Sequence, residues 1–137
     1  MSLVDPTKKM SKSDPNPNGA IGLLEDPKTA RKKIMSAVTD SGNEVRLDWK
    51  AKPGISNLLE IYSQLSGQEY VGSNNYGEFK SVVADVVERF LIGFQKKYKE
   101  IFESGKLESI LETGAKKSYE ISHPKLLEVY KKIGFLI

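Results

Sequence analysis

Residues 76–103, YGEFKSVVADVVERFLIGFQKKYKEIFE, form the longest sustained apolar pattern in the chain. Apolar side chains recur there every three or four residues, which is the spacing of one face of an α-helix. Gly105 follows, and glycine favours the left-handed conformation that commonly ends helices. The stretch predicts a helix over 76–103 and a mainly α fold. The apolar positions are Phe79, Val83, Val86, Val87, Phe90, Phe94, Tyr98 and Ile101.

Two helices are predicted before this stretch. Asp26-Pro27 is typical of a helix N-terminus, with a capping carboxylate followed by proline in the first turn. Together with the apolar spacing that follows, this dipeptide predicts a helix over 27–38. A second apolar pattern predicts a helix over 55–66, which Gly67 ends.

Two further helices are predicted after Gly105. The first begins near Leu107 and closes at Gly114, and the second occupies most of the remaining chain. Pro124 lacks a backbone donor, so we expect a kink or a restart of the last helix just before it. The predicted fold class is mainly α, a helical bundle over residues 27–137.

The residues before the bundle have a different composition. Met1–Val4 is a short apolar stub, which we interpret as the end of a strand from a larger sheet. Residues 7–22 are rich in Lys, Ser, Pro, Asn and Gly, which resist regular structure, and they predict a loop that projects from the bundle. Within the bundle, apolar and polar side chains alternate over residues 45–50. This stretch is short, so it predicts at most a hairpin-like excursion.

The composition limits the chemistry available to the chain. Its 137 residues suffice for one domain or two small ones. Because it has no cysteine and one histidine, we expect no disulfide, no thiolate nucleophile and no metal-ligating residues. No uncharged apolar run approaches the length of a membrane span, and no signal peptide is recognisable, so we expect no membrane partner and a cytoplasmic location.

Positive charge is concentrated at the two ends of the sequence. Residues 8–33 contain seven Lys or Arg and three acidic residues, and residues 94–137 contain nine and six. Between them, residues 34–93 contain five and eight. This distribution suits one anionic ligand near the start of the chain and an anionic surface near its end. For the second basic region, lysines that only solvate a helix face explain the pattern equally well.

The stretch Lys9-Met10-Ser11-Lys12-Ser13 asks for a chemical explanation. Its two lysines are three residues apart, and with the neighbouring backbone N–H groups they can bind one polyphosphate. Lysine suits this role because its compact charge can follow a phosphate that moves as a leaving group. Met10 can anchor the loop on an apolar neighbour, while flexible flanking residues let the loop close. The residue types alone fit a solvated basic loop as well.

The same five residues match the KMSKS signature of class I aminoacyl-tRNA synthetases. The surrounding sequence resembles the C-terminal part of the bacterial tryptophanyl-tRNA synthetase family, and the resemblance covers essentially the whole chain. KMSKS alone is moderately specific, whereas its combination in order with further segments is much more specific. Those segments are Asp14-Pro15-Asn16, Leu23-Leu24-Glu25-Asp26, Lys33-Ile34, Ala37-Val38-Thr39-Asp40-Ser41, Lys52-Pro53-Gly54-Ile55-Ser56-Asn57-Leu58-Leu59, Tyr76-Gly77 and Phe79-Lys80.

This resemblance implies an enzyme that activates tryptophan with ATP and magnesium and then transfers it to the tRNA for tryptophan. It implies that the mobile ATP-binding loop consists of Lys9, Met10, Ser11, Lys12 and Ser13. Within that loop, Lys9 and Lys12 are expected to be the catalytic residues, because the family implies that they stabilise pyrophosphate as it leaves.

The resemblance also divides the chain into two parts. Residues 1–26 resemble the end of a Rossmann-type catalytic domain with its signature loop, and residues 27–137 resemble the helical anticodon-binding domain. The family's HIGH-like nucleotide segment and its tryptophan pocket are missing from the sequence. We therefore interpret the chain as a fragment without the N-terminal catalytic domain, and expect it to be inactive alone. The intact enzyme is expected to be a homodimer.

Lys96 and Lys99 are the candidate tRNA-binding residues, because they lie in the second basic region near the end of the predicted long helix. Two other interpretations of the chain stay open. The first is a fragment of a tyrosyl-tRNA synthetase, whose signature loop is similar but which fits residues 37–41 less well. The second is a non-catalytic helical interaction module, which predicts no preference among tRNAs.

Overall fold

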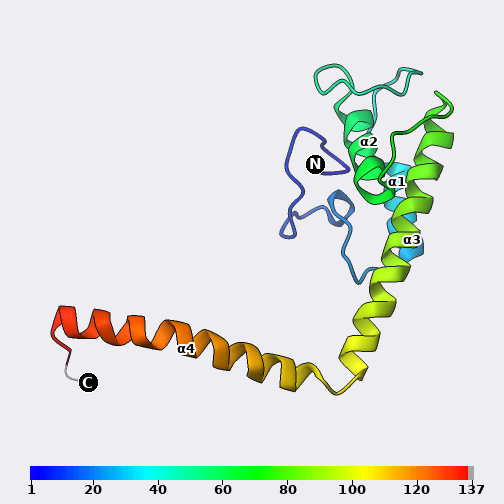
Figure 1. The fold of residues 1–137 in the computed structure, drawn as a ribbon. Coiled ribbons are helices and arrows are strands. Elements are labelled where there is room, and N and C mark those ends of the chain that lie inside the picture. The colour runs from blue at the N-terminus through cyan, green and yellow to red at the C-terminus, as the bar shows by residue number, and fades with distance from the viewer. Residues whose placement is uncertain (136–137) are drawn as a thin grey trace. The chain divides into compact units, whose positions relative to one another are not determined.

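The computed structural model describes residues 1–135 and is mainly helical, as predicted (Figure 1). No β-strand occurs among these residues. The chain forms two compact units, Met1–Lys96 and Lys97–Ile137. The elements are a short 3₁₀ turn η1 (Pro17–Gly19) and the helices α1 (Pro27–Ser36), α2 (Pro53–Ser66), α3 (Tyr76–Glu103) and α4 (Leu107–Ile133).

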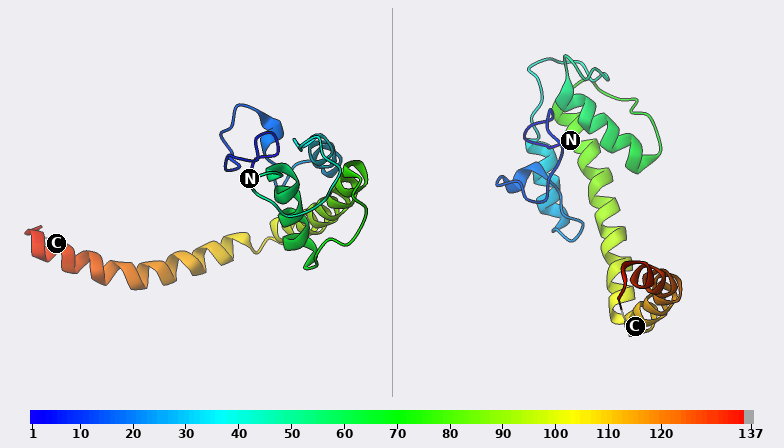
Figure 2. Two further views of the ribbon diagram at one scale, coloured as in Figure 1. Left: turned by 90° about the horizontal axis from the view of Figure 1, so that it is seen from above. Right: turned by 90° about the vertical axis from the view of Figure 1, so that its left-hand side faces the viewer.

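In the first unit, α1, α2 and the first part of α3 pack side by side around one apolar core (Figure 2). Each helix contributes its apolar face, and Ile34 of α1, Leu58 of α2 and Phe79 of α3 are fully buried. Burial of one such side chain contributes about 1.5–3 kcal/mol. The core consists of Leu3, Ala30, Ile34, Ala37, Ile55, Leu58, Phe79, Val83, Ala84, Val87 and Leu91.

The N-terminal segment is part of this core and forms no strand in this chain, and the predicted loop after it is attached to the core through Met10 and Ile21. Leu3 is buried, and its carbonyl accepts a hydrogen bond from the Val38 N–H at 2.8 Å. This contact draws the chain away from the axis of α1, which ends at Ser36 and not at residue 38 as predicted. Single backbone hydrogen bonds thus take the place of a strand ladder.

The structure bears out the helices predicted on either side of residue 70. α3 has the predicted bounds, and Gly67 ends α2 with a left-handed φ of 71°. α2 begins at Pro53, two residues earlier than predicted, because proline is tolerated in the first turn, where its missing N–H has no partner to lose.

Residues 45–50 form an irregular loop and not the predicted hairpin-like excursion. The Val45 N–H donates to the Asn74 side chain at 3.0 Å, and the Asp48 N–H donates to the Ser56 hydroxyl at 2.8 Å. Side chains therefore satisfy the backbone groups that a hairpin would pair with each other.

α4 is a single helix from Leu107 to Ile133, so the predicted end at Gly114 and the predicted restart near Pro124 are wrong. Only Gly67, Gly105 and Gly134 have positive φ among the described residues, so Gly114 keeps the helical conformation. A proline inside a helix removes one backbone donor, and the remaining hydrogen bonds carry α4 past that position. Among residues 1–135, no helix has both the length and the apolar character that crossing a membrane requires.

Candidate functional site

The KMSKS stretch lies in a closed loop, residues 8–19, which we call the signature loop. Two adjacent buried residues hold its ends: the Ser2 N–H donates to the Lys8 carbonyl at 2.8 Å, and the Leu3 N–H donates to the Gly19 carbonyl at 3.0 Å. Because its ends meet, the signature loop resembles an Ω-loop, a form in which a fixed base carries an exposed tip.

The base of the signature loop requires glycine. A Cβ atom at Gly19 would lie 2.9 Å from the Ser2 Oγ and 3.4 Å from the Val4 Cγ2. A side chain there would push the loop away from its backbone partners. Residues 20–25, which we call the exit segment, lead from this base to α1.

Short-range turns shape the signature loop between its ends. The Asp14 carboxylate accepts a hydrogen bond from the Asn16 N–H at 2.8 Å, and the Asn16 side chain accepts one from the Asn18 N–H at 3.0 Å. The hydroxyl oxygens of Ser11 and Ser13 lie 3.2 Å apart. Such side chain-to-backbone turns hold a backbone conformation without helix or sheet.

The lysines of the signature loop differ in their contacts. The Lys8 ammonium lies 2.9 Å from the Asp5 carboxylate. Lys9 and Lys12 are exposed, and their ammonium groups make no hydrogen bond or ion pair with any described residue. Met10, which lies between them in sequence, packs against the core, as the sequence predicts. The loop therefore presents two ammonium groups to solvent from an anchored backbone, an arrangement that can bind a polyphosphate.

Asp5 neutralises the remaining lysine at the base of the loop. A hydrogen bond from the Thr7 hydroxyl, at 2.6 Å, and one from the Lys8 ammonium lower the pKa of Asp5 to about 2. The same contact raises the pKa of Lys8 above its ordinary value. The positive charge left for an external anion is therefore that of Lys9 and Lys12.

The exit segment is attached to two helices. The Lys33 ammonium of α1 donates to the Ala20 carbonyl at 3.0 Å and pairs with the Glu25 carboxylate at 2.6 Å. The Gln95 amide of α3 donates to the Leu23 carbonyl at 3.0 Å and to the Glu25 carbonyl at 2.7 Å. Sequence reasoning missed both residues, because three of these four contacts are made to backbone carbonyls, which leave no mark on the sequence.

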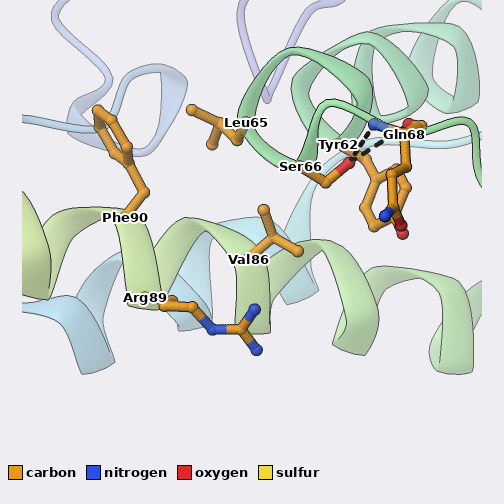
Figure 3. Close-up of a pocket in the computed structure, with 7 residues that line it drawn as sticks. All are labelled: Tyr62, Leu65, Ser66, Gln68, Val86, Arg89 and Phe90. Atoms are coloured by element: carbon orange, nitrogen blue, oxygen red, sulfur yellow. Dashed lines mark hydrogen bonds between the residues drawn. The ribbon is translucent and has the colours of Figure 1, made fainter.

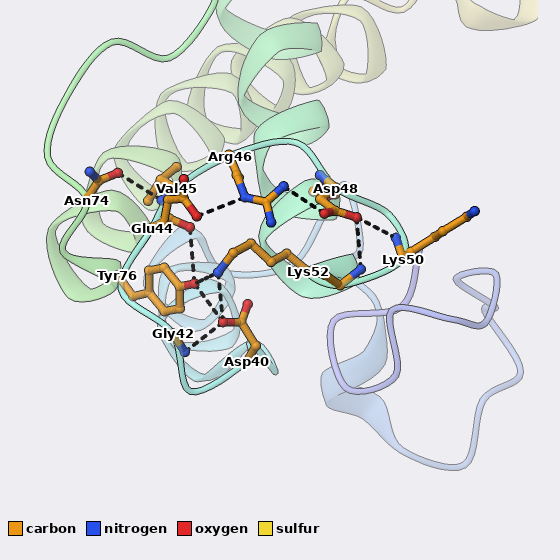
Figure 4. A network of polar contacts seen from close by, with 12 residues as sticks. Asp40, Gly42, Glu44, Val45, Arg46, Asp48, Lys50, Lys52, Asn74 and Tyr76 are labelled. Carbon is orange, nitrogen blue, oxygen red and sulfur yellow. Dashed lines mark hydrogen bonds and ion pairs between the residues drawn. The ribbon is translucent and has the colours of Figure 1, made fainter.

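A second polar cluster connects the segment before α2 with the start of α3 (Figure 4). The Lys52 ammonium donates to the Asp40 carboxylate at 3.1 Å and to the Tyr76 phenol oxygen at 2.9 Å. The phenol and the Gly42 N–H donate to the same carboxylate at 2.8 and 2.7 Å. Burial alone raises the pKa of Asp40, but hydrogen bonds from Tyr76, Gly42 and Lys52 outweigh it, so its pKa lies below the ordinary value. The two charges pair with each other through Asp40 Oδ1, which indicates a structural role, while Asp40 Oδ2 is buried without a hydrogen-bond partner among the described residues.

A shallow groove of about 350 Å³ lies between α2 and α3 (Figure 3). Leu65 and Val86 form apolar walls, and Arg89 at its edge makes no hydrogen bond or ion pair with any described residue. The groove shares no lining residue with the signature loop. Its lining residues are Tyr62, Leu65, Ser66, Gln68, Val86, Arg89 and Phe90.

The two candidate tRNA-binding lysines lie one turn apart on α3, Lys96 in the first compact unit and Lys99 in the second. The Lys99 ammonium lies 3.8 Å from the Glu103 carboxylate, and both side chains are well exposed. A pair of this kind contributes little to stability, so Lys99 can exchange its partner for a phosphate at small cost.

Comparisons with known proteins identify the family of the chain. A family model described as class I tRNA synthetases (W and Y) matches residues 1–103. The tryptophan–tRNA ligase of Bacillus anthracis is 48% identical in an alignment of 141 positions that covers 98% of this chain and 43% of that protein. The tryptophan–tRNA ligase of Caldanaerobacter subterraneus subsp. tengcongensis is 46% identical over 100% of this chain and 43% of its own length.

A solved structure shares the fold of the whole chain. The tryptophanyl-tRNA synthetase from Mycoplasma pneumoniae matches it with a TM-score of 0.88 at 28% identity, over 100% of this chain and 45% of that one. The chain therefore spans less than half the length of the curated relatives and of the solved structure that it matches.

Proposed function

Because the chain belongs to the class I tRNA synthetases of the tryptophan and tyrosine type, we propose that it is the C-terminal part of a tryptophan–tRNA ligase. Relatives of that name, 45–48% identical over nearly the whole chain, support tryptophan over tyrosine as the amino acid. The order of segments from Asp14 to Lys80 supports the same choice.

In the proposed reaction, a carboxylate oxygen of tryptophan attacks the α-phosphorus of ATP, the bond from that phosphorus to the bridging oxygen breaks, and pyrophosphate leaves. A hydroxyl at the 3′ end of the tRNA then attacks the carbonyl carbon of the tryptophanyl-adenylate, the bond from that carbon to the phosphate oxygen breaks, and AMP leaves. Magnesium accompanies ATP as its counter-ion. The signature loop supplies Lys9 and Lys12, whose charges stabilise the negative charge that develops on the departing pyrophosphate. Met10, Ser11 and Ser13 hold the backbone of the loop in the geometry that binds ATP.

One observation carries this proposal: Lys9 and Lys12 lack internal partners, whereas Lys8 beside them is paired with Asp5. An anchored loop with two uncompensated charges is suited to an anion that arrives from outside and departs again.

The remaining parts follow from the same family membership. We propose that residues 1–26 complete a catalytic domain whose larger part precedes them in the longer protein, and that residues 27–137 are the anticodon-binding domain. The intact ligase is proposed to be a cytoplasmic homodimer. The chain alone has no HIGH-like segment, so we expect it to show no ATP–pyrophosphate exchange.

The test is tryptophan-dependent ATP–pyrophosphate exchange by the longer protein that contains this chain. Lys12→Ala is expected to lower the exchange rate about a hundredfold, because one stabilising charge is lost from the transition state. Lys50→Ala is the matched control, since Lys50 is also an exposed loop lysine without a side-chain partner among the described residues. Exchange that depends on tyrosine and not on tryptophan would support the tyrosyl alternative.

For tRNA binding, we propose that Lys96 and Lys99 contact backbone phosphates. Replacing both by alanine is expected to weaken binding of the tRNA for tryptophan and to reduce the slope of log affinity against log salt by about 1.5. An unchanged slope would show that these lysines do not contact phosphates and only solvate the surface of the helix. Equal affinity of the unaltered chain for all tRNAs would favour the non-catalytic interaction module.

A further inference from the structure

Gln95 is a polar residue of α3 that lies about one turn beyond Leu91, the last fully buried apolar residue of this helix. The earlier buried residues of α3 include Phe79, Val83 and Val87. The partly buried amide of Gln95 points at two backbone carbonyls of the exit segment and not at another side chain.

These hydrogen bonds are poorly explained by stability alone. The contact with the Leu23 carbonyl is exposed, where water can replace the donor, and that with the Glu25 carbonyl is partly buried. Exchange of water for a protein donor contributes little net free energy. The exit segment is also held to α1 by Lys33 and to the core by Ile21, so what the Gln95 amide adds is its attachment to α3.

The exit segment and the signature loop share the base at Gly19. On one side, Leu3 holds this base through a single backbone hydrogen bond. On the other side, the chain is held next by Lys33 at Ala20 and then by Gln95. Displacement of the exit segment would therefore be transmitted to the Gly19 end of the loop, and through the loop backbone to Lys9 and Lys12.

We propose that Gln95 is a positioning residue for the signature loop: through the carbonyls of Leu23 and Glu25 it fixes the exit segment, and so sets where Lys9 and Lys12 meet the phosphates of ATP. This inference rests on the proposed ATP-binding role of the loop. Gln95 itself touches neither nucleotide nor amino acid. Its contribution is geometric, because small displacements of catalytic charges carry large kinetic costs.

Three substitutions distinguish the hydrogen bonds donated by the Gln95 amide from the packing of its side chain. Gln95→Met keeps the length of the side chain and removes both donors. Gln95→Glu keeps its shape but aims a carboxylate at two carbonyls. Gln95→Lys restores a donor and serves as the rescue variant. Gln64→Met is the matched control, because Gln64 is an exposed glutamine of α2 whose side chain makes no hydrogen bond with any described residue.

The first measurement uses the 137-residue chain and does not depend on any activity. Backbone hydrogen exchange across residues 8–25 is expected to be at least several-fold faster in Gln95→Met and Gln95→Glu, and near the original rate in Gln95→Lys and Gln64→Met. Unchanged exchange in Gln95→Met would overturn the inference.

The second measurement is ATP–pyrophosphate exchange by the longer protein. Gln95→Met and Gln95→Glu are expected to lower kcat/KM for ATP about tenfold with KM for tryptophan unchanged, and Gln95→Lys to restore most of it. Full activity of Gln95→Met beside an impaired Lys12→Ala would overturn the positioning role and leave the proposed function intact. Full activity of Lys12→Ala would overturn the proposed role of this lysine in the loop, and no tryptophan-dependent exchange by the unaltered longer protein would overturn the proposed function; in either case the first measurement would still decide whether Gln95 holds the loop.

Discussion

The lysines of the signature loop and the lysines of the helical core have the same chemistry but different partners. In the core, Lys52 donates to Asp40 and Tyr76, and Lys80 donates to the Ala37 carbonyl at 2.8 Å. In the loop, Lys9 and Lys12 donate to no described residue. A lysine with internal acceptors joins segments of the fold, whereas a lysine held in place without acceptors can bind an external anion.

The two groups of lysines also differ in burial, since Lys80 is partly buried and Lys9 and Lys12 are exposed. Desolvation lowers the pKa of Lys80, and its ammonium is directed to the carbonyl end of α1, where the helix dipole favours positive charge. The fold therefore tolerates partly buried ammonium groups where carbonyls or carboxylates surround them. Such lysines should affect stability when replaced, and those of the loop should affect chemistry.

The largest expected effect is on catalysis by the longer protein. Replacing Lys9 and Lys12 together by alanine should lower tryptophan-dependent pyrophosphate exchange about a thousandfold or more, because both charges facing the leaving group are lost. The free energy of unfolding of the chain should change by less than about 0.5 kcal/mol, since neither side chain contacts the fold. A clear loss of stability without loss of exchange would reverse our assignment of these lysines.

The opposite pattern is expected for Lys52. Lys52→Met should lower the midpoint of thermal unfolding by about 10 °C, because the partly buried Asp40 carboxylate loses its cationic partner. Pyrophosphate exchange per folded molecule should be unchanged. Thermal unfolding followed by circular dichroism measures the first quantity, and Lys50→Ala, at an exposed position, should leave it unaltered.

Most of the fold could be predicted from the sequence where one physical signal dominates. The apolar stripe of α3 fixed both of its ends, and Asp26-Pro27 fixed the start of α1. The errors arose where conformation depends on distant partners. Gly114 predicts a helix end, but a glycine ends a helix in this way only when its φ is positive. The φ of Gly114 is not positive, and the sequence does not reveal this. The end of α1 depends on Leu3, which lies far away in sequence.

The candidate site was predictable in part for the same reason. The residue types of the KMSKS stretch indicate a phosphate loop, and Met10 was expected to anchor it. The difference between Lys8 and its neighbours depends on the geometry of Asp5, and the attachment of the exit segment depends on carbonyl groups that every residue has.

A smaller effect tests how the core lysine is held. Tyr76→Phe removes the phenol that donates to Asp40 and accepts from Lys52. The free energy of unfolding should fall by about 1 kcal/mol, because the direct contact between the ammonium and the carboxylate survives. Urea denaturation measures this change. A loss as large as that of Lys52→Met would show that the phenol, and not the ammonium, holds the cluster together.

The smallest effect is expected at Asp5, which precedes the signature loop and, like Asp40 in the core, pairs with a lysine. Its pKa is about 2, against an ordinary value of 3.8, and the first cause is the hydrogen bond from the Thr7 hydroxyl, followed by that from Lys8. The folded pKa is the lower one, so ionised Asp5 favours the folded loop base above about pH 4, and this contribution is lost as the pH falls from 3.8 towards 2.

Thr7→Ala should therefore raise the pKa of Asp5 towards 3.8, and by more than Lys8→Gln does, because the hydroxyl is the stronger of the two influences. Titration of the Asp5 carboxyl carbon by NMR measures both shifts. If Lys8→Gln had the larger effect, the ion pair would control this carboxylate, and Lys8 would be bound as firmly as Lys52 in the core. Lys8 would then be held by its ion pair with Asp5, and only the charges of Lys9 and Lys12 would be available to ATP.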